Sequence, residues 1–149
     1  MDHSEGPFIQ AACFAEMVLR DDTGVFSLIR IIDRVSQTAA GPNPPEKMSP
    51  FHYPLRIFIS LKSGKALGHS EICIVPELPN GETLDPIRLT AHFEGGEHGF
   101  SAVINFDINF SIEGLYWFEV YVEGKHVTSM PLRIIYDRRF INSPLQIQP

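Results

Sequence analysis

Apolar and polar residues alternate along the last third of the chain. In residues 100–110 nearly every second position is apolar, which is the period of a strand with one buried face. Residues 115–122 follow, rich in the aromatic and β-branched side chains that favour a central strand. A turn signal at 123–125 precedes a third alternating run, residues 126–136. The pattern predicts three consecutive strands in an antiparallel meander.

The first third has the same character. Residues 8–20 alternate, although the content of Ala, Glu, Met and Leu also favours a helix there. We prefer a strand, because the polar run 21–24 is typical of a turn and residues 25–35 are rich in Val and Ile. This part of the chain is therefore expected to form a β-hairpin.

Three shorter runs, residues 55–61, 70–75 and 87–93, also read as strands. With about eight strands and no convincing helix, the pattern indicates an all-β protein, an antiparallel β-sandwich with Greek-key connections. We expect a flexible N-terminus at 1–7, one domain over 8–136 and a C-terminal tail over 137–149.

Two segments allow alternative interpretations. The Pro-rich stretch 36–50 contains Pro44 and Pro45 and is either a binding loop or a plain crossover between sheets. The tail either docks on a protein surface or frays.

The composition narrows the range of functions. With 149 residues and a net charge of −6, the chain is the size of one domain and lacks the basic surface typical of nucleic-acid binding. No apolar run is long enough to span a bilayer, so we expect no membrane partner. The two cysteines and the absence of a secretory signal indicate the cytoplasm.

Possible metal ligands are densest at the turn after residue 91. His92, Glu94, Glu97 and His98 surround a Gly-Gly pair, and imidazole and carboxylate groups both bind zinc-like ions. The alternative is an ordinary solvated turn.

Motifs for nucleophilic catalysis and for phosphate binding are missing from the sequence. Cys13 and Cys73 are 60 residues apart in sequence and are expected in the core. We therefore expect no cofactor and regard an enzyme as the less favoured reading.

The strand 115–122 offers the best lead to a function. Trp117, Glu119 and Tyr121 share one face, opposite a face that must be core. Exposed aromatic residues with polar neighbours are typical of protein interfaces. The alternative is a central strand covered on both faces.

Two resemblances bear on the fold. Residues 114–118, Gly-Leu-Tyr-Trp-Phe, resemble the Gly-x-Tyr-x-Cys stretch of immunoglobulin-like domains, with Phe118 in place of the disulfide cysteine. This implies a tyrosine corner and an immunoglobulin-like topology without the disulfide. The stretches at 20–27, 29–35 and 114–120, with Pro-Leu-Arg-Ile-Ile-Tyr at 131–136, resemble a family of small uncharacterised bacterial proteins. That likeness implies a bacterial origin and no particular activity.

Two functional hypotheses follow. The first is a non-catalytic interaction module or accessory subunit that binds a protein partner, or a second copy, through Trp117 and Tyr121 or through the Pro-rich loop. The second is a small-ligand or metal-binding protein, with or without enzymatic activity, whose site is the loop at 92–98.

Overall fold

A computed structural model describes residues 5–142, and within this range the chain forms strands and no helix. None of the described residues forms a helix long and apolar enough to cross a membrane. The seven strands are β1 (Phe8–Arg20), β2 (Phe26–Ile32), β3 (Arg34–Gly41), β4 (Phe51–Glu77), β5 (Ile87–Phe110), β6 (Gly114–Val122) and β7 (Lys125–Phe140). All pairs are antiparallel except β3 with β7. The expectation of an all-β, mostly antiparallel protein is confirmed.

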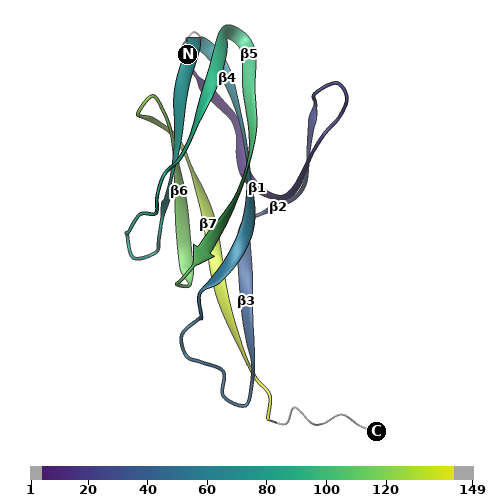
Figure 1. Cartoon of the computed structure of the whole chain (residues 1–149), viewed down its shortest axis with the longest axis vertical. Coiled ribbons are helices and arrows are strands. Elements are labelled where there is room, and N and C mark those ends of the chain that lie inside the picture. Colours follow the sequence, from purple (N-terminus) through teal and green to yellow (C-terminus); the bar gives the residue numbers. More distant parts are fainter. Residues whose placement is uncertain (1–4, 143–149) are drawn as a thin grey trace.

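The β4–β5 hairpin bends over at the upper end of the domain (Figure 1) and so joins its two layers. The first half of β4 pairs with β1, and its second half pairs with β6. Between these halves the register shifts near the pair Gly64 and Gly96, which have φ values of 56° and 62°. Glycine tolerates this left-handed backbone, so both strands bend without ending. The expected strands 55–61 and 70–75 are therefore two halves of β4, and the expected strands 87–93 and 100–110 are two halves of β5.

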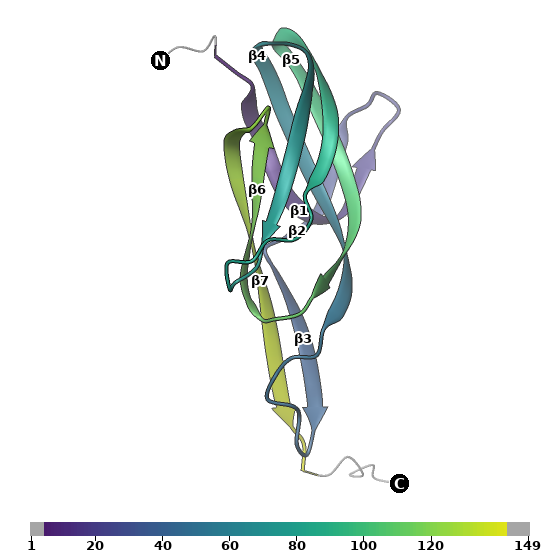
Figure 2. The ribbon, with the colours of Figure 1, turned by 60° about the vertical axis from the view of Figure 1, so that its left-hand side comes forward.

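Because β4 and β5 pass through both layers, each layer contains half of each strand (Figure 2). We call layer I the sheet of β2, β1, the first half of β4 and the second half of β5. Layer II contains the first half of β5, the second half of β4, and β6, β7 and β3.

The core lies between the two layers. The ring of Phe118 on β6 is 4.9 Å from Phe14 on β1 and 6.2 Å from Phe106 on β5, measured between ring centroids. These contacts join residues of layer II to residues of layer I, as expected for face-to-face packing in a β-sandwich. Phe118 has no exposed surface. An apolar ring therefore fills this core site, as the sequence predicted.

The expected meander 100–136 is wrong in one respect. The strand at 100–110 pairs with β4 and not with β6, because residues 111–113 carry the chain from layer I to layer II. Tyr116 holds this crossover: its hydroxyl donates to the carbonyl of Ile112 at 2.7 Å and lies 3.3 Å from the Ile112 amide. Gly114, at φ 131°, lies so close to Pro79 that a Cβ would approach its ring to 2.8 Å. The predicted tyrosine corner is present.

Another correction concerns residues 25–50. The expected strand at 25–35 is interrupted at Asp33, after which the chain moves from layer I to layer II and forms β3. The first six residues of the expected loop, 36–41, therefore belong to a strand that runs parallel to β7. The strand β7 in turn extends to Phe140, four residues into the expected tail. Residues 1–4 and 143–149 of the two expected terminal segments lie outside the described range.

Candidate interaction surface on the outer face of layer II

The outward side of β6 contains the predicted interface residues. Trp117 is 37% exposed, and Glu119 and Tyr121 are half-buried, whereas Phe118 and Val120 between them are fully buried. This alternation follows from the period of two in a strand. Within the described chain, the outer face of β6 is therefore not covered by another sheet.

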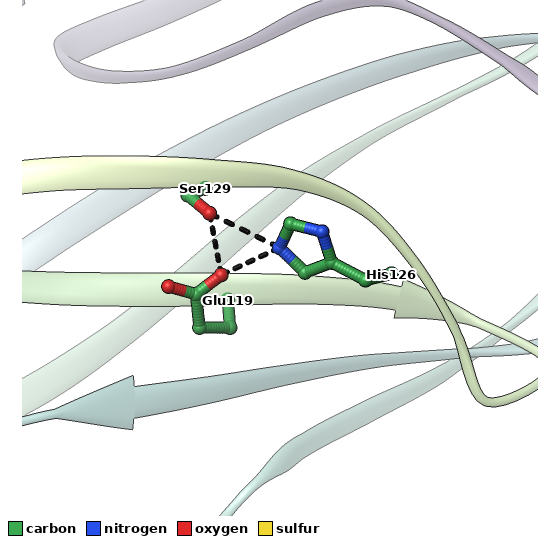
Figure 3. A network of polar contacts seen from close by, with 3 residues as sticks. All are labelled: Glu119, His126 and Ser129. Atoms are coloured by element: carbon green, nitrogen blue, oxygen red, sulfur yellow. Dashed lines mark hydrogen bonds and ion pairs between the residues drawn. The ribbon is translucent and has the colours of Figure 1, made fainter.

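A polar network lies on this face (Figure 3). The hydroxyl of Ser129 donates to Oε2 of Glu119 at 2.5 Å, and Nε2 of His126 lies 2.6 Å from the same oxygen. The same Nε2 is 3.0 Å from Oγ of Ser129. In a hydrolytic triad the acid and the serine contact opposite ring nitrogens, so that the imidazole can accept the serine proton. Here both contact Nε2 and the serine donates to the acid, so the network orients the imidazole and does not activate the serine.

The ring of His126 in turn packs against Tyr121, with centroids 5.4 Å apart and planes at 70°. Two positive-φ residues, Glu123 at 48° and Gly124 at 77°, close the hairpin that brings β7 back along β6. That turn sets Ser129 opposite Glu119 and His126 opposite Tyr121. The β6–β7 hairpin thus fixes both the polar network and the orientation of Tyr121.

Sequence reasoning missed His126 and Ser129. Their proximity to Glu119 depends on the register of the hairpin, and the register includes a bulge between Val120 and Tyr121. Counting outward from the turn at 123–124 places His126 opposite Tyr121, but it places Thr128 opposite Glu119, so Ser129 is reached only through the bulge.

The surface continues onto β4. Cys73 lies opposite Tyr121, and Glu77 lies opposite Trp117, while Pro131 on β7 lies on the other side of Trp117. Cys73 is a half-buried free thiol. Trp117 therefore stands between an acidic residue and a proline, in the middle of three paired strands.

Pro44 and Pro45 lie elsewhere. The carbonyl of Pro44 accepts a bond from Nη2 of Arg138 at 2.8 Å, and the carbonyl of Pro45 accepts one from the hydroxyl of Tyr136 at 2.6 Å. Both donors belong to the part of β7 beyond Ile134, where pairing with β6 has ended. Pro44 is itself buried, so the loop is fastened to β7 and does not adjoin the face around Trp117.

The four candidate metal ligands do not form one cluster. Nδ1 of His98 is 3.8 Å from a carboxylate oxygen of Glu94, whereas His92 faces His69 across the β4–β5 ladder, with ring centroids 4.8 Å apart. Between residues 5 and 142, no three His, Cys, Asp or Glu residues are grouped so that they could hold a metal ion together. Sequence reasoning missed His69, which only the register of the long hairpin brings opposite His92.

Two further features of the described chain are candidates for reactive sites: a surface depression and the thiol of Cys13. A shallow depression of about 340 Å³ lies beside the connection from β4 to β5, and its lining includes Leu84, Asp85 and Phe106 but no histidine or cysteine. Burial raises the pKa of the Cys13 thiol, which disfavours the reactive thiolate. Neither feature provides a nucleophile with a base.

The strand pairing and the tyrosine corner at Tyr116 define the domain as an immunoglobulin-like β-sandwich. Among solved structures, an immunoglobulin-like protein from Pseudomonas aeruginosa is similar at 12% identity and a TM-score of 0.44, over 89% of this chain and 99% of that chain. No protein-family model matches the chain. A search of curated proteins found no matching relative.

Proposed function

We propose that the chain is a non-catalytic interaction module, an accessory subunit in the bacterial cytoplasm, which binds a protein partner through the outer face of β6. One observation carries the proposal: Trp117 is 37% exposed at the centre of three paired strands. Tryptophan and tyrosine are enriched among the residues that dominate binding energies at interfaces. The bacterial and cytoplasmic setting is supported by the resemblance described above and by two free cysteines.

The surroundings of Trp117 favour a particular kind of partner. The carboxylates of Glu77 and Glu119 lie on strands β4 and β6 of the same face, and the whole chain has a net charge of −6. A complementary partner surface would present an apolar pocket for the indole ring within a basic rim. The network of Glu119, His126 and Ser129 holds Tyr121 in place before binding, which lowers the entropy cost of forming the interface.

The proposal can be tested with three forms of the full chain: wild type, Trp117→Ala and Leu67→Ala. Leu67 is 74% exposed on β4, so it provides a matched control for loss of an exposed apolar side chain. Proteins that co-purify with wild type from bacterial cells are purified and titrated calorimetrically. We expect Trp117→Ala to weaken binding at least tenfold, or about 1.4 kcal/mol, with Leu67→Ala unchanged. Equal binding by all three forms would refute the proposal.

A second candidate function is transition-metal binding, and the His69–His92 pair favours it. Two imidazoles on adjacent strands could provide two ligands, with water in the remaining positions. The test is a calorimetric titration with Ni²⁺ alone. Loss of heat in both His69→Ala and His92→Ala, but not in His98→Ala, would support this function, and equal heat in all four proteins would oppose it.

A further inference from the structure

The second surface of interest is the projecting part of the β1–β2 hairpin, residues 16–32, which we call the arm. It extends beyond the edge of layer I, away from β6 and β7 (Figures 1 and 2). Pairing of β1 with β4 ends at Ala15, so beyond that residue β1 pairs with β2 alone. Within the described chain β2 has no other partner strand. The arm is therefore a two-stranded ribbon.

The two faces of the arm differ. On the face of the even-numbered residues, the ring of Phe26 packs on Phe58 of β4 at 5.3 Å. Nε of Arg30 also lies 2.7 Å from a carboxylate oxygen of Glu16 on this face. This face of the arm is thus turned partly toward the domain and carries a charge pair.

The face of the odd-numbered residues is apolar and open. Cross-strand partners share a face, and here Met17 pairs with Ile29 and Ala15 with Ile31. The exposed fractions are Met17 47%, Leu19 48%, Ile29 40% and Ile31 65%, with Val25 at the turn 60% exposed. Five of the ten large apolar side chains that are exposed in the described chain thus lie on this one element.

An isolated two-stranded ribbon is marginally stable in water unless another surface covers its apolar side. The exposed parts of these five side chains amount to roughly 400–500 Å² of apolar surface, the size of the largest patch on a typical monomer. A dimer interface of standard size buries about 800 Å² per partner, and about 65% of it is apolar in homodimers, or about 500 Å². The apolar face of the arm thus matches one half of a homodimer interface in area.

We propose that this face packs against the same face of a second copy, across a two-fold axis. The exposed apolar area of the arm supports this contact between two copies, and so does the distribution of charged residues. A chain of net charge −6 repels its own copies, so a contact that contains few acids is favoured. The odd-numbered positions listed by the register are all uncharged: Ala15, Met17, Leu19, Ser27, Ile29 and Ile31. The acid nearest to this face is Asp21, opposite Val25 at the end of the arm. Glu16 lies on the other face, and a two-fold contact uses the same patch from both copies.

The test is the solution mass of the full chain by light scattering between about 1 and 100 µM, a range that brackets a micromolar dimer. We expect the wild type to be a dimer at the upper end. Ile31→Lys and, on the other strand, Met17→Lys should each weaken dimerisation at least tenfold, because each places a desolvated charge in an apolar contact. Circular dichroism establishes that each variant is folded, and two variants guard against misfolding of one.

Two controls separate this dimer from the proposed function. Leu67→Lys adds the same charge at an exposed apolar site outside the arm and should remain dimeric. Trp117→Ala should also remain dimeric, although it loses the heterologous partner. A wild type that is monomeric at about 100 µM would overturn the inference and leave the arm to a different partner. Dimerisation that persists in both folded arm variants would overturn it as well, by locating the contact elsewhere.

Discussion

The β4–β5 and β1–β2 hairpins have similar residue patterns and different surroundings. Ile57, Ile59 and Ile72 on β4 have no exposed surface, because the inner face of each half of that strand packs against the opposite layer. Ile29 and Ile31 on β2 are also apolar residues two positions apart, but they are 40% and 65% exposed. A period of two therefore tells which residues share a face. Whether anything covers that face depends on the neighbouring strands.

The largest expected difference comes from the same substitution in each hairpin. Ile59→Ala removes a fully buried side chain and should lower the free energy of unfolding by about 2–5 kcal/mol. Ile29→Ala, measured at a concentration at which the chain is monomeric, should cost only about 1–2 kcal/mol, because water already reaches part of that side chain. Urea denaturation measures both values. Equal losses would mean that the arm is packed more tightly within one chain than its exposure indicates.

A smaller difference is expected between two tyrosine hydroxyl groups. Tyr116, at the crossover after β5, is 1% exposed, and its hydroxyl contacts both backbone groups of Ile112. Tyr116→Phe should cost about 1–3 kcal/mol, because the partly buried carbonyl of Ile112 loses its partner. Tyr136→Phe removes an exposed bond to the Pro45 carbonyl and should cost less than about 1 kcal/mol. Thermal melts of the two variants provide the measurement. A larger loss of stability in Tyr136→Phe than in Tyr116→Phe would mean that the Tyr116 hydroxyl does not stabilise the crossover at residues 111–113.

The smallest effect concerns the turn of the arm. Bonds from the Thr23 hydroxyl, and from the Val25 and Thr23 amides, lower the pKa of Asp21 below its ordinary value of 3.8. A carboxyl whose pKa is lowered by folding adds stability above its unfolded pKa. Its contribution should therefore be complete above about pH 4 and be lost as the pH falls through the lower, folded pKa.

The measurement is the unfolding free energy at several pH values below 4, for wild type and Asp21→Asn. The variant retains an acceptor oxygen and cannot titrate, so its pH dependence should be weaker. A carbon NMR titration of the Asp21 carboxyl checks the direction of the shift directly. A midpoint above 3.8 would contradict the turn geometry.

Much of the fold was predictable because it depends on local pattern. Alternation identified strands on both sides of the Asp21–Gly24 turn, and the spacing of Gly114, Tyr116 and Phe118 predicted the corner. The continuity of β4 through Gly64 was not predictable, because a glycine can mark a bend as well as a reversal. The short strand β3 was missed because its small and polar residues gain their partner only from β7, almost 100 residues later.

The candidate surface was predicted in part. Alternation put Trp117, Glu119 and Tyr121 on one face, and the structure agrees on that geometry. His126 and Ser129 reach Glu119 through a bulged register, which a pattern of residue types does not encode. The role of this face in binding stays a prediction until a partner is titrated.

The passage of β4 through both layers has a consequence for anything that binds the protein. The strand pairs with β1, which leads into the arm, and further along with β6, which carries Trp117. One continuous strand, bent near Gly64, thus connects the two proposed docking surfaces, and a strand that is hydrogen-bonded to its neighbours stretches very little. The domain would act as a spacer of set length, so that a dimer formed through the arms would present two copies of the Trp117 face at a fixed separation and orientation.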